Sequence, residues 1–109
     1  MSRSDMIRFV PWPFPGDRFP PELGVVVMRT VLDGRRPACL VWHSPDNDWA
    51  IGDGVDDPNA PGACVVTHLS HLLDLDPTLG ELASMPPGHR ADRSGPGAAW
   101  SVVPAIDED

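Results

Sequence analysis

The chain has 109 residues, with sixteen acidic residues against eight arginines and no lysine, for a formal net charge of −8. Contacts to nucleic-acid phosphates need cations, so this charge argues against nucleic acid as a partner. The length fits one domain with one core. No apolar run reaches the roughly 20 residues of a membrane-spanning helix, and prolines 11, 13 and 15 interrupt any apolar signal segment. A cytoplasmic protein that does not enter a membrane is therefore expected.

Residues 1–22 precede the predicted domain and combine aromatic side chains with prolines. The prolines of this segment are too frequent for a helix or a paired strand, and they alternate with the aromatic residues Phe9, Trp12, Phe14 and Phe19. Disordered segments are usually poor in aromatic residues, which favours an ordered lid laid across a sheet. A segment that docks on a partner is the alternative, because extended proline-rich segments bind aromatic grooves.

Three consecutive strands are predicted within residues 23–53. The first, residues 23–32, is rich in valine and ends at Asp33–Gly34, a dipeptide that suits the positive φ angles of a hairpin. The second covers residues 38–43. We predict an antiparallel meander, because connections this short exclude the crossovers that parallel strands need.

A second turn joins the predicted second and third strands. Ser44, Pro45, Asp46 and Asn47 are typical turn residues, since proline presets φ and the short polar side chains bond to the backbone. In the third strand, residues 48–52, Trp49 and Ile51 share one face. The sheet should therefore have one apolar side.

Two short helices are predicted after the strands. Residues 63–66 suggest a short strand, and residues 67–76 follow as an amphipathic helix with Thr67 as its N-cap. Asp76 and Pro77 predict a cap and first position for a second helix over residues 76–83.

The remaining residues complete the predicted domain and its tail. Residues 88–97 are expected to form a polar loop, residues 98–103 an edge strand with Trp100, and residues 104–109 an acidic tail. The expected fold is one α+β domain over residues 23–103, a small, mainly antiparallel sheet of a three-strand meander plus one or two short strands, with two short helices.

Catalytic motifs are missing from the sequence. There is no phosphate-binding glycine loop, nucleophile elbow, paired-cysteine zinc motif or metalloprotease helix. Cys39 and Cys64 lie in apolar patterns and are interpreted as buried, inert thiols. A non-enzymatic protein without a cofactor is the prediction.

Metal binding is the alternative that the histidines leave open. His68 and His71 are three residues apart on a predicted helix, a spacing that lets two imidazoles face one ion, and His43 would be the third ligand. A small metal-binding protein or metal-dependent enzyme would use these residues. Two histidines on the polar side of a short helix are more often ordinary surface residues.

Turns and tryptophans recur along residues 19–100, at Leu32–Gly34, Trp42–His43, Asp46–Trp49, Asp53–Asp57, Thr67–His71, Asp76–Thr78, Leu82–Gly88 and Trp100. This pattern resembles a family of small actinobacterial-type proteins of uncharacterised function. That family is similar in layout to the small α+β immunity proteins found beside polymorphic toxins. The likeness implies a protein that binds another protein, such as a basic toxin, and it implies no catalytic residues.

The acidic turns supply the predicted binding surface. Five acids fall within residues 46–57, and we expect them to form a rim that meets a basic protein: Asp46, Asp48, Asp53, Asp56 and Asp57. Trp42 or Trp12 would anchor the partner if exposed. Two alternatives stay open, namely that the acids only keep the protein soluble and that the chain is an assembly component that associates through a sheet edge or the N-terminal arm.

Overall fold

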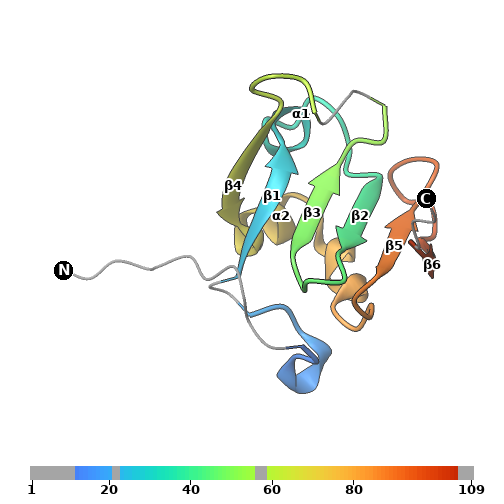
Figure 1. The fold of residues 1–109 in the computed structure, drawn as a ribbon. Helices are drawn as coiled ribbons and strands as arrows, with labels where there is room; N and C mark the ends of the chain where they lie inside the picture. The colour runs from blue at the N-terminus through green and yellow to red at the C-terminus, as the bar shows by residue number, and fades with distance from the viewer. Residues whose placement is uncertain (1–11, 21–22, 56–58, 106–109) are drawn as a thin grey trace.

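The computed structural model describes residues 12–20, 23–55 and 59–105. They form a single mixed sheet with short helices (Figure 1). In chain order the elements are η1 (Pro15–Asp17), β1 (Gly24–Met28), α1 (Arg29–Leu32), β2 (Leu40–His43), β3 (Trp49–Gly52), β4 (Cys64–His68), α2 (Leu69–Leu75), η2 (Pro77–Leu82), β5 (His89–Asp92) and β6 (Ser101–Pro104).

The six strands lie in the order β4-β1-β3-β2-β5-β6. β1 and β3 run parallel, and the other neighbouring pairs are antiparallel. The predicted α+β class and mainly antiparallel sheet are confirmed. The β2–β3 hairpin over Ser44–Asn47 is also as predicted, since His43 pairs with Trp49.

The predicted three-strand meander is wrong at its first step. β1 pairs with β3 and not with β2, so β3 is inserted between its two predecessors. β2 is two strand positions from β1, about 10 Å away, which a tight hairpin cannot span. The helical turn α1 and the following loop cover that distance, because they carry the chain past the end of β3.

The first predicted strand stops early for the same reason. β1 ends at Met28, and Arg29 and Thr30 begin α1. The Thr30 hydroxyl donates a 2.6 Å hydrogen bond to Asp53, directly after β3. This contact holds α1 over the end of β3. The Asp33–Gly34 dipeptide follows the helical turn and does not form a hairpin.

Residues 89–92, which were expected to lie in a polar loop, form the strand β5. Its side chains are polar except for Ala91, which is fully buried, so the strand lacks an apolar alternation. It pairs antiparallel with β2 on one side and with β6 on the other. β6 is the edge strand that residues 98–103 predicted, shifted towards the C-terminus.

The two predicted helices lie on one face of the sheet, and Figure 1 shows α2 behind the strands. Asp76 caps η2 as predicted, because its carboxylate accepts a 3.1 Å hydrogen bond from the Thr78 N–H. Thr67 is not an N-cap, because it lies in β4 and pairs with Val25 of β1. α2 begins after His68, which makes no side-chain cap bond. Among the described residues no helix is long and apolar enough to cross a membrane.

The core lies between the sheet and these helices. Its largest fully buried side chain is Trp49, which packs among buried residues of β1, β2, α2 and η2. Phe14 is buried beside Trp49, with ring centroids 6.1 Å apart, and Phe19 meets Trp49 edge to face at 4.9 Å. Residues 12–20 therefore close one end of the core, as a lid would; Phe9 lies outside the described residues.

Candidate protein-binding surface

None of the described helices lies over the second face of the sheet (Figure 1). Strand register places six side chains in one row across this face, which we name the open row: Val66, Val26, Ala50, Trp42, Arg90 and Val103. Sheets exposed to water on one side normally carry polar residues there. Five members of the open row are apolar, so this face departs from that pattern.

Trp42 is the largest side chain of the open row. It is 43% exposed, and Val66 at the sheet edge is 45% exposed. Between Trp42 and Val66 lie Val26 and the small Ala50. An aromatic side chain that stands beside small residues offers a partner both an anchor and a hollow.

A depression of about 1170 Å³ lies in this area. Its floor is mostly apolar and includes Val26, Met28, Leu40, Trp42 and Ala50. Met28 leans over Gly52, where an added methyl group would come within 3.2 Å of its sulfur. Its volume exceeds the roughly 300–1,000 Å³ of most small-molecule pockets, which favours a protein as the partner.

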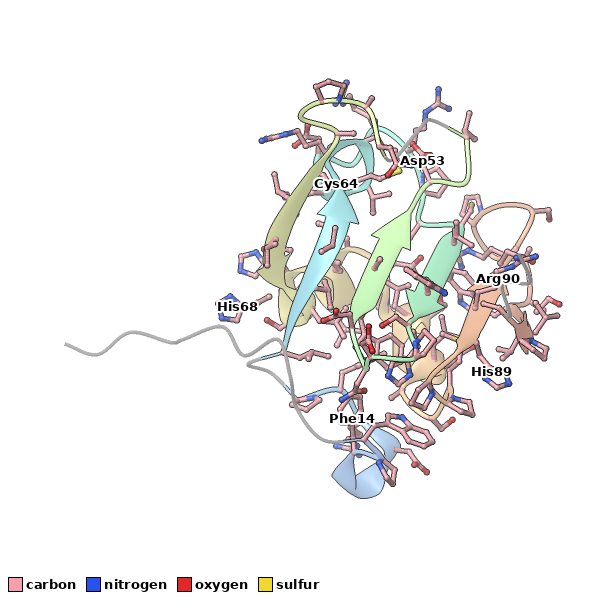
Figure 2. All side chains as sticks on the ribbon, in the orientation of Figure 1. Phe14, Asp53, Cys64, His68, His89 and Arg90 are labelled. Carbon is pink, nitrogen blue, oxygen red and sulfur yellow. The ribbon has the colours of Figure 1, made fainter. Side chains whose placement is uncertain are left out.

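Arg90 is the only charged member of the open row, and its charge is offset by Asp92, two residues further along β5. Arg90 Nε lies 3.4 Å from Asp92 Oδ2, and both side chains are about half exposed. Figure 2 shows Arg90 on the strand next to β2. The centre of this face is therefore close to neutral in an otherwise acidic protein.

Trp12, the other proposed anchor, has a different role. Its indole N–H donates a 3.1 Å hydrogen bond to the carbonyl of Ala83, and its ring meets that of His43 edge to face. It is only partly exposed and packs against the core. Trp42 is therefore the tryptophan that remains available to a partner.

Asp53 does not belong to an exposed acidic rim. Its side chain is fully buried and accepts hydrogen bonds from the Thr30 hydroxyl (2.6 Å) and the Val55 N–H (2.8 Å), with Arg36 Nε 3.7 Å away. A carboxylate buried with these partners serves the fold, because it fixes α1 and the loop after β3. The sequence indicated the acid but not its burial.

The other predicted rim acids fall into two groups. Asp46 is exposed and Asp48 is half-buried, both in the β2–β3 turn, where the Ser44 hydroxyl accepts hydrogen bonds from their N–H groups at 3.2 and 3.1 Å. Pro45 of the same turn borders the depression. Asp56 and Asp57 lie outside the described residues.

His43 is a core residue with both ring nitrogens engaged. Nδ1 lies 2.7 Å from the carbonyl oxygen of Met85, and Nε2 lies 2.6 Å from Oδ1 of Asn47. The ring is fully buried and stacks on Trp49 at 3.8 Å. These contacts leave no nitrogen lone pair directed to a metal ion.

His68 and His71 lie near each other, with ring centroids 6.2 Å apart. In the part of the chain that the structure describes, no three side chains of His, Cys, Asp or Glu gather closely enough to hold a metal ion. The set His43, His68 and His71 is therefore not brought together. Cys39 and Cys64, expected to be buried, are half-buried.

A charged pocket of about 540 Å³ lies at another end of the sheet, but its buried charges serve the fold. The Arg93 side chain is 1% exposed and pairs with Asp76 at 2.5 Å. It also donates to the Ala38 carbonyl and the Thr78 hydroxyl, and its guanidinium lies 4.3 Å from the Trp100 ring centre. Burial alone would raise the pKa of Asp76, but hydrogen bonds from Thr78 and Arg93 outweigh it and lower that pKa.

Of the open row, only Trp42 was predicted from the sequence as a binding residue. Val26, Ala50 and Val66 were assigned to strands, but the register that aligns them depends on the β1–β3 pairing. Arg90 was missed because β5 was expected to be a loop.

Comparison with family models, curated proteins and solved structures returns no match.

Proposed function

We propose that this chain is a non-enzymatic, acidic protein-binding module that binds a basic protein on the open face of its sheet. Trp42 is the anchor, and the depression beside it receives an apolar side chain of the partner. The observation that supports this most is the open row, in which an exposed tryptophan lies in register with Ala50, Val26 and Val66. Buried aromatic anchors contribute much of the energy of protein interfaces.

The charge of the chain favours a basic partner. The net charge of −8 attracts a cationic protein and speeds its encounter. Asp46 is exposed beside Pro45 at the border of the depression, where it can meet a lysine or arginine of the partner. The resemblance to immunity proteins implies a basic toxin as the partner, and a basic toxin would offer such lysine and arginine side chains.

The first test compares three forms of the protein in affinity capture from the native host. Trp42→Ala removes the proposed anchor, and Val102→Ala is its control because Val102 is similarly exposed but lies on the opposite face, next to Ala91. Basic proteins retained by wild type and Val102→Ala but lost with Trp42→Ala are candidate partners. With a purified candidate, Trp42→Ala should weaken binding by about 30-fold, as expected for a loss of about 2 kcal/mol at a hot spot.

The second test addresses charge. Asp46→Arg should slow association by about tenfold at low salt, and rising salt should slow wild-type association as well. Glu81→Arg is the control, because Glu81 is exposed on η2 on the helix-covered side. Equal binding by wild type and Trp42→Ala would reject the open face as the binding surface. Equal effects of Asp46→Arg and Glu81→Arg would reject a local role for the β2–β3 turn.

A further inference from the structure

The two edge strands of the sheet, β4 and β6, differ in how their outer edges are protected. An edge strand offers its peptide groups to any other strand, and proteins block such edges with proline or charged side chains. β6 ends in Pro104. β4 has the sequence Cys-Val-Val-Thr-His, without proline, aspartate, glutamate, lysine or arginine. β4 is therefore the less protected edge.

Val66 lies at the centre of this edge, with its peptide groups directed outward. Along an antiparallel strand, the backbone N–H and C=O groups of one residue bond to the neighbouring strand, and those of the next residue point away from it. The N–H of Arg29 donates to the Ala63 carbonyl at 2.7 Å, and that of Leu69 donates to the Leu23 carbonyl at 2.9 Å. The backbone groups of residues 63, 65, 67 and 69 therefore bond to β1. The backbone N–H and C=O groups of residues 64, 66 and 68 point away from β1, towards the outer edge of the sheet.

The same alternation places Val102 and Pro104 at the outer edge of β6. The N–H of Ala105 donates to the Gly88 carbonyl at 2.8 Å, so residues 101, 103 and 105 bond to β5. Pro104 has no N–H, which removes one of the two donors that β6 could offer. Val66 and Val102 are both 45% exposed, and this makes Val102 a matched reference for Val66.

We propose that β4 is a dimerisation edge, on which β4 of a second copy of this chain pairs antiparallel about a two-fold axis at Val66. In this register Val66 faces Val66 of the second copy, and the two residues exchange two backbone hydrogen bonds. Residues 64 and 68 lie opposite each other on either side, so the register is symmetric over the whole strand. The two six-stranded sheets become continuous, and so do their open rows.

Charge near this edge permits self-association although each copy carries a net charge of −8. β4 itself contains no aspartate, glutamate, lysine or arginine. Arg29 of α1 lies beside the start of β4, where its side chain donates a 2.8 Å hydrogen bond to the Gly62 carbonyl. At physiological salt, repulsion between exposed charges is screened over about 8 Å, which weakens the repulsion between two copies.

The test is the mass of the full chain in solution, measured by sedimentation velocity over a range of concentrations. One pair of edge strands buries little surface, so we expect a weak dimer that forms between about 10 μM and 1 mM. Val66→Lys places two like charges opposite each other and should raise the dimer dissociation constant by about tenfold or more. Val102→Lys, on the other edge, should leave that constant unchanged. Circular dichroism of both variants verifies their fold.

Cross-linking gives a second measurement that does not depend on Val66→Lys. Residues that form a hydrogen-bonded antiparallel pair have Cα atoms about 5.5 Å apart, within the range of a disulfide. Oxidised Val66→Cys should therefore give a covalent dimer, whereas Val102→Cys and wild type, which retain Cys39 and Cys64, should not. The proposal is overturned if wild type stays monomeric at about 1 mM, or if the variants at 66 and 102 behave alike in either measurement.

Discussion

The two faces of the sheet carry tryptophans that differ sharply in environment. Trp49 on β3 is 1% exposed and lies among His43, Phe14 and Phe19. Trp42, on the neighbouring strand β2, points to the other face and is 43% exposed. Successive strand residues point to opposite faces, so the same hairpin supplies both. The described helices cover one face, whereas the other face is largely apolar and none of those helices covers it.

Two ion pairs, one buried and one exposed, also differ between the two faces of the sheet. Arg93 is buried, with its partner Asp76 at the start of η2, and connects β5 to the covering layer. Arg90, three residues earlier, pairs with Asp92 on the opposite face, where both side chains are about half exposed. A pair in a buried setting fixes the relative positions of two elements, whereas an exposed pair contributes little to stability.

The largest effect should come from the tryptophan on the covered face. Trp49→Ala removes the largest fully buried side chain and should lower the free energy of unfolding by about 3–5 kcal/mol. Trp42→Ala, on the open face, should cost about 1 kcal/mol or less. Urea unfolding followed by circular dichroism measures both values. Similar losses from the two changes would mean that the open face is packed as tightly as the core.

The second effect concerns the two ion pairs. Asp76→Ala leaves the buried guanidinium of Arg93 without its carboxylate and removes the cap of η2, so it should lower the free energy of unfolding by about 3 kcal/mol. Asp92→Ala breaks the exposed pair with Arg90 and should cost about 0.5 kcal/mol. The same unfolding experiment measures both. A cost of Asp92→Ala as large as that of Asp76→Ala would contradict the assignment of these roles.

Local signals in the sequence predicted the elements that depend on neighbouring residues. The Ser44–Asn47 turn and the Asp76–Pro77 cap are formed by side chains that bond to nearby backbone groups, and both were predicted correctly. Periodicity also predicted an amphipathic helix in residues 67–76, and in α2 Leu69 and Leu72 form its buried side. These features need no knowledge of the rest of the fold.

Features that depend on distant residues were not predictable in this way. The parallel β1–β3 pairing is supported by the bond between Thr30 and Asp53, twenty-three residues apart. β5 has only Ala91 in the core, so its identity as a strand comes from pairing with β2 and β6. The burial of Asp53 follows from the same long-range contacts. The candidate surface could therefore be inferred only as far as Trp42 and Asp46.

The smallest effect is a pH dependence that separates the two ion pairs. The pKa of Asp76 in the folded chain lies below its ordinary value of 3.8, because hydrogen bonds from Thr78 and Arg93 outweigh the effect of burial. A lowered folded-state pKa stabilises the protein above the unfolded-state pKa, and that stability is lost as pH falls through the folded-state value. Wild type should therefore exceed Asp76→Asn in unfolding free energy by a constant amount from neutral pH to about pH 4, and by progressively less below it.

Thermal or urea unfolding of wild type and Asp76→Asn between about pH 7 and pH 2 measures this difference. The two proteins differ only at position 76, so the difference between their unfolding free energies isolates the Asp76 carboxylate. Asp92→Asn is the matched control from the open face, since its carboxylate is about half exposed beside Arg90. Its free energy of unfolding should differ little from that of wild type, because an exposed ion pair contributes little to stability. A difference for Asp76→Asn that does not shrink in acid would show that its stabilising contacts do not depend on the carboxylate charge.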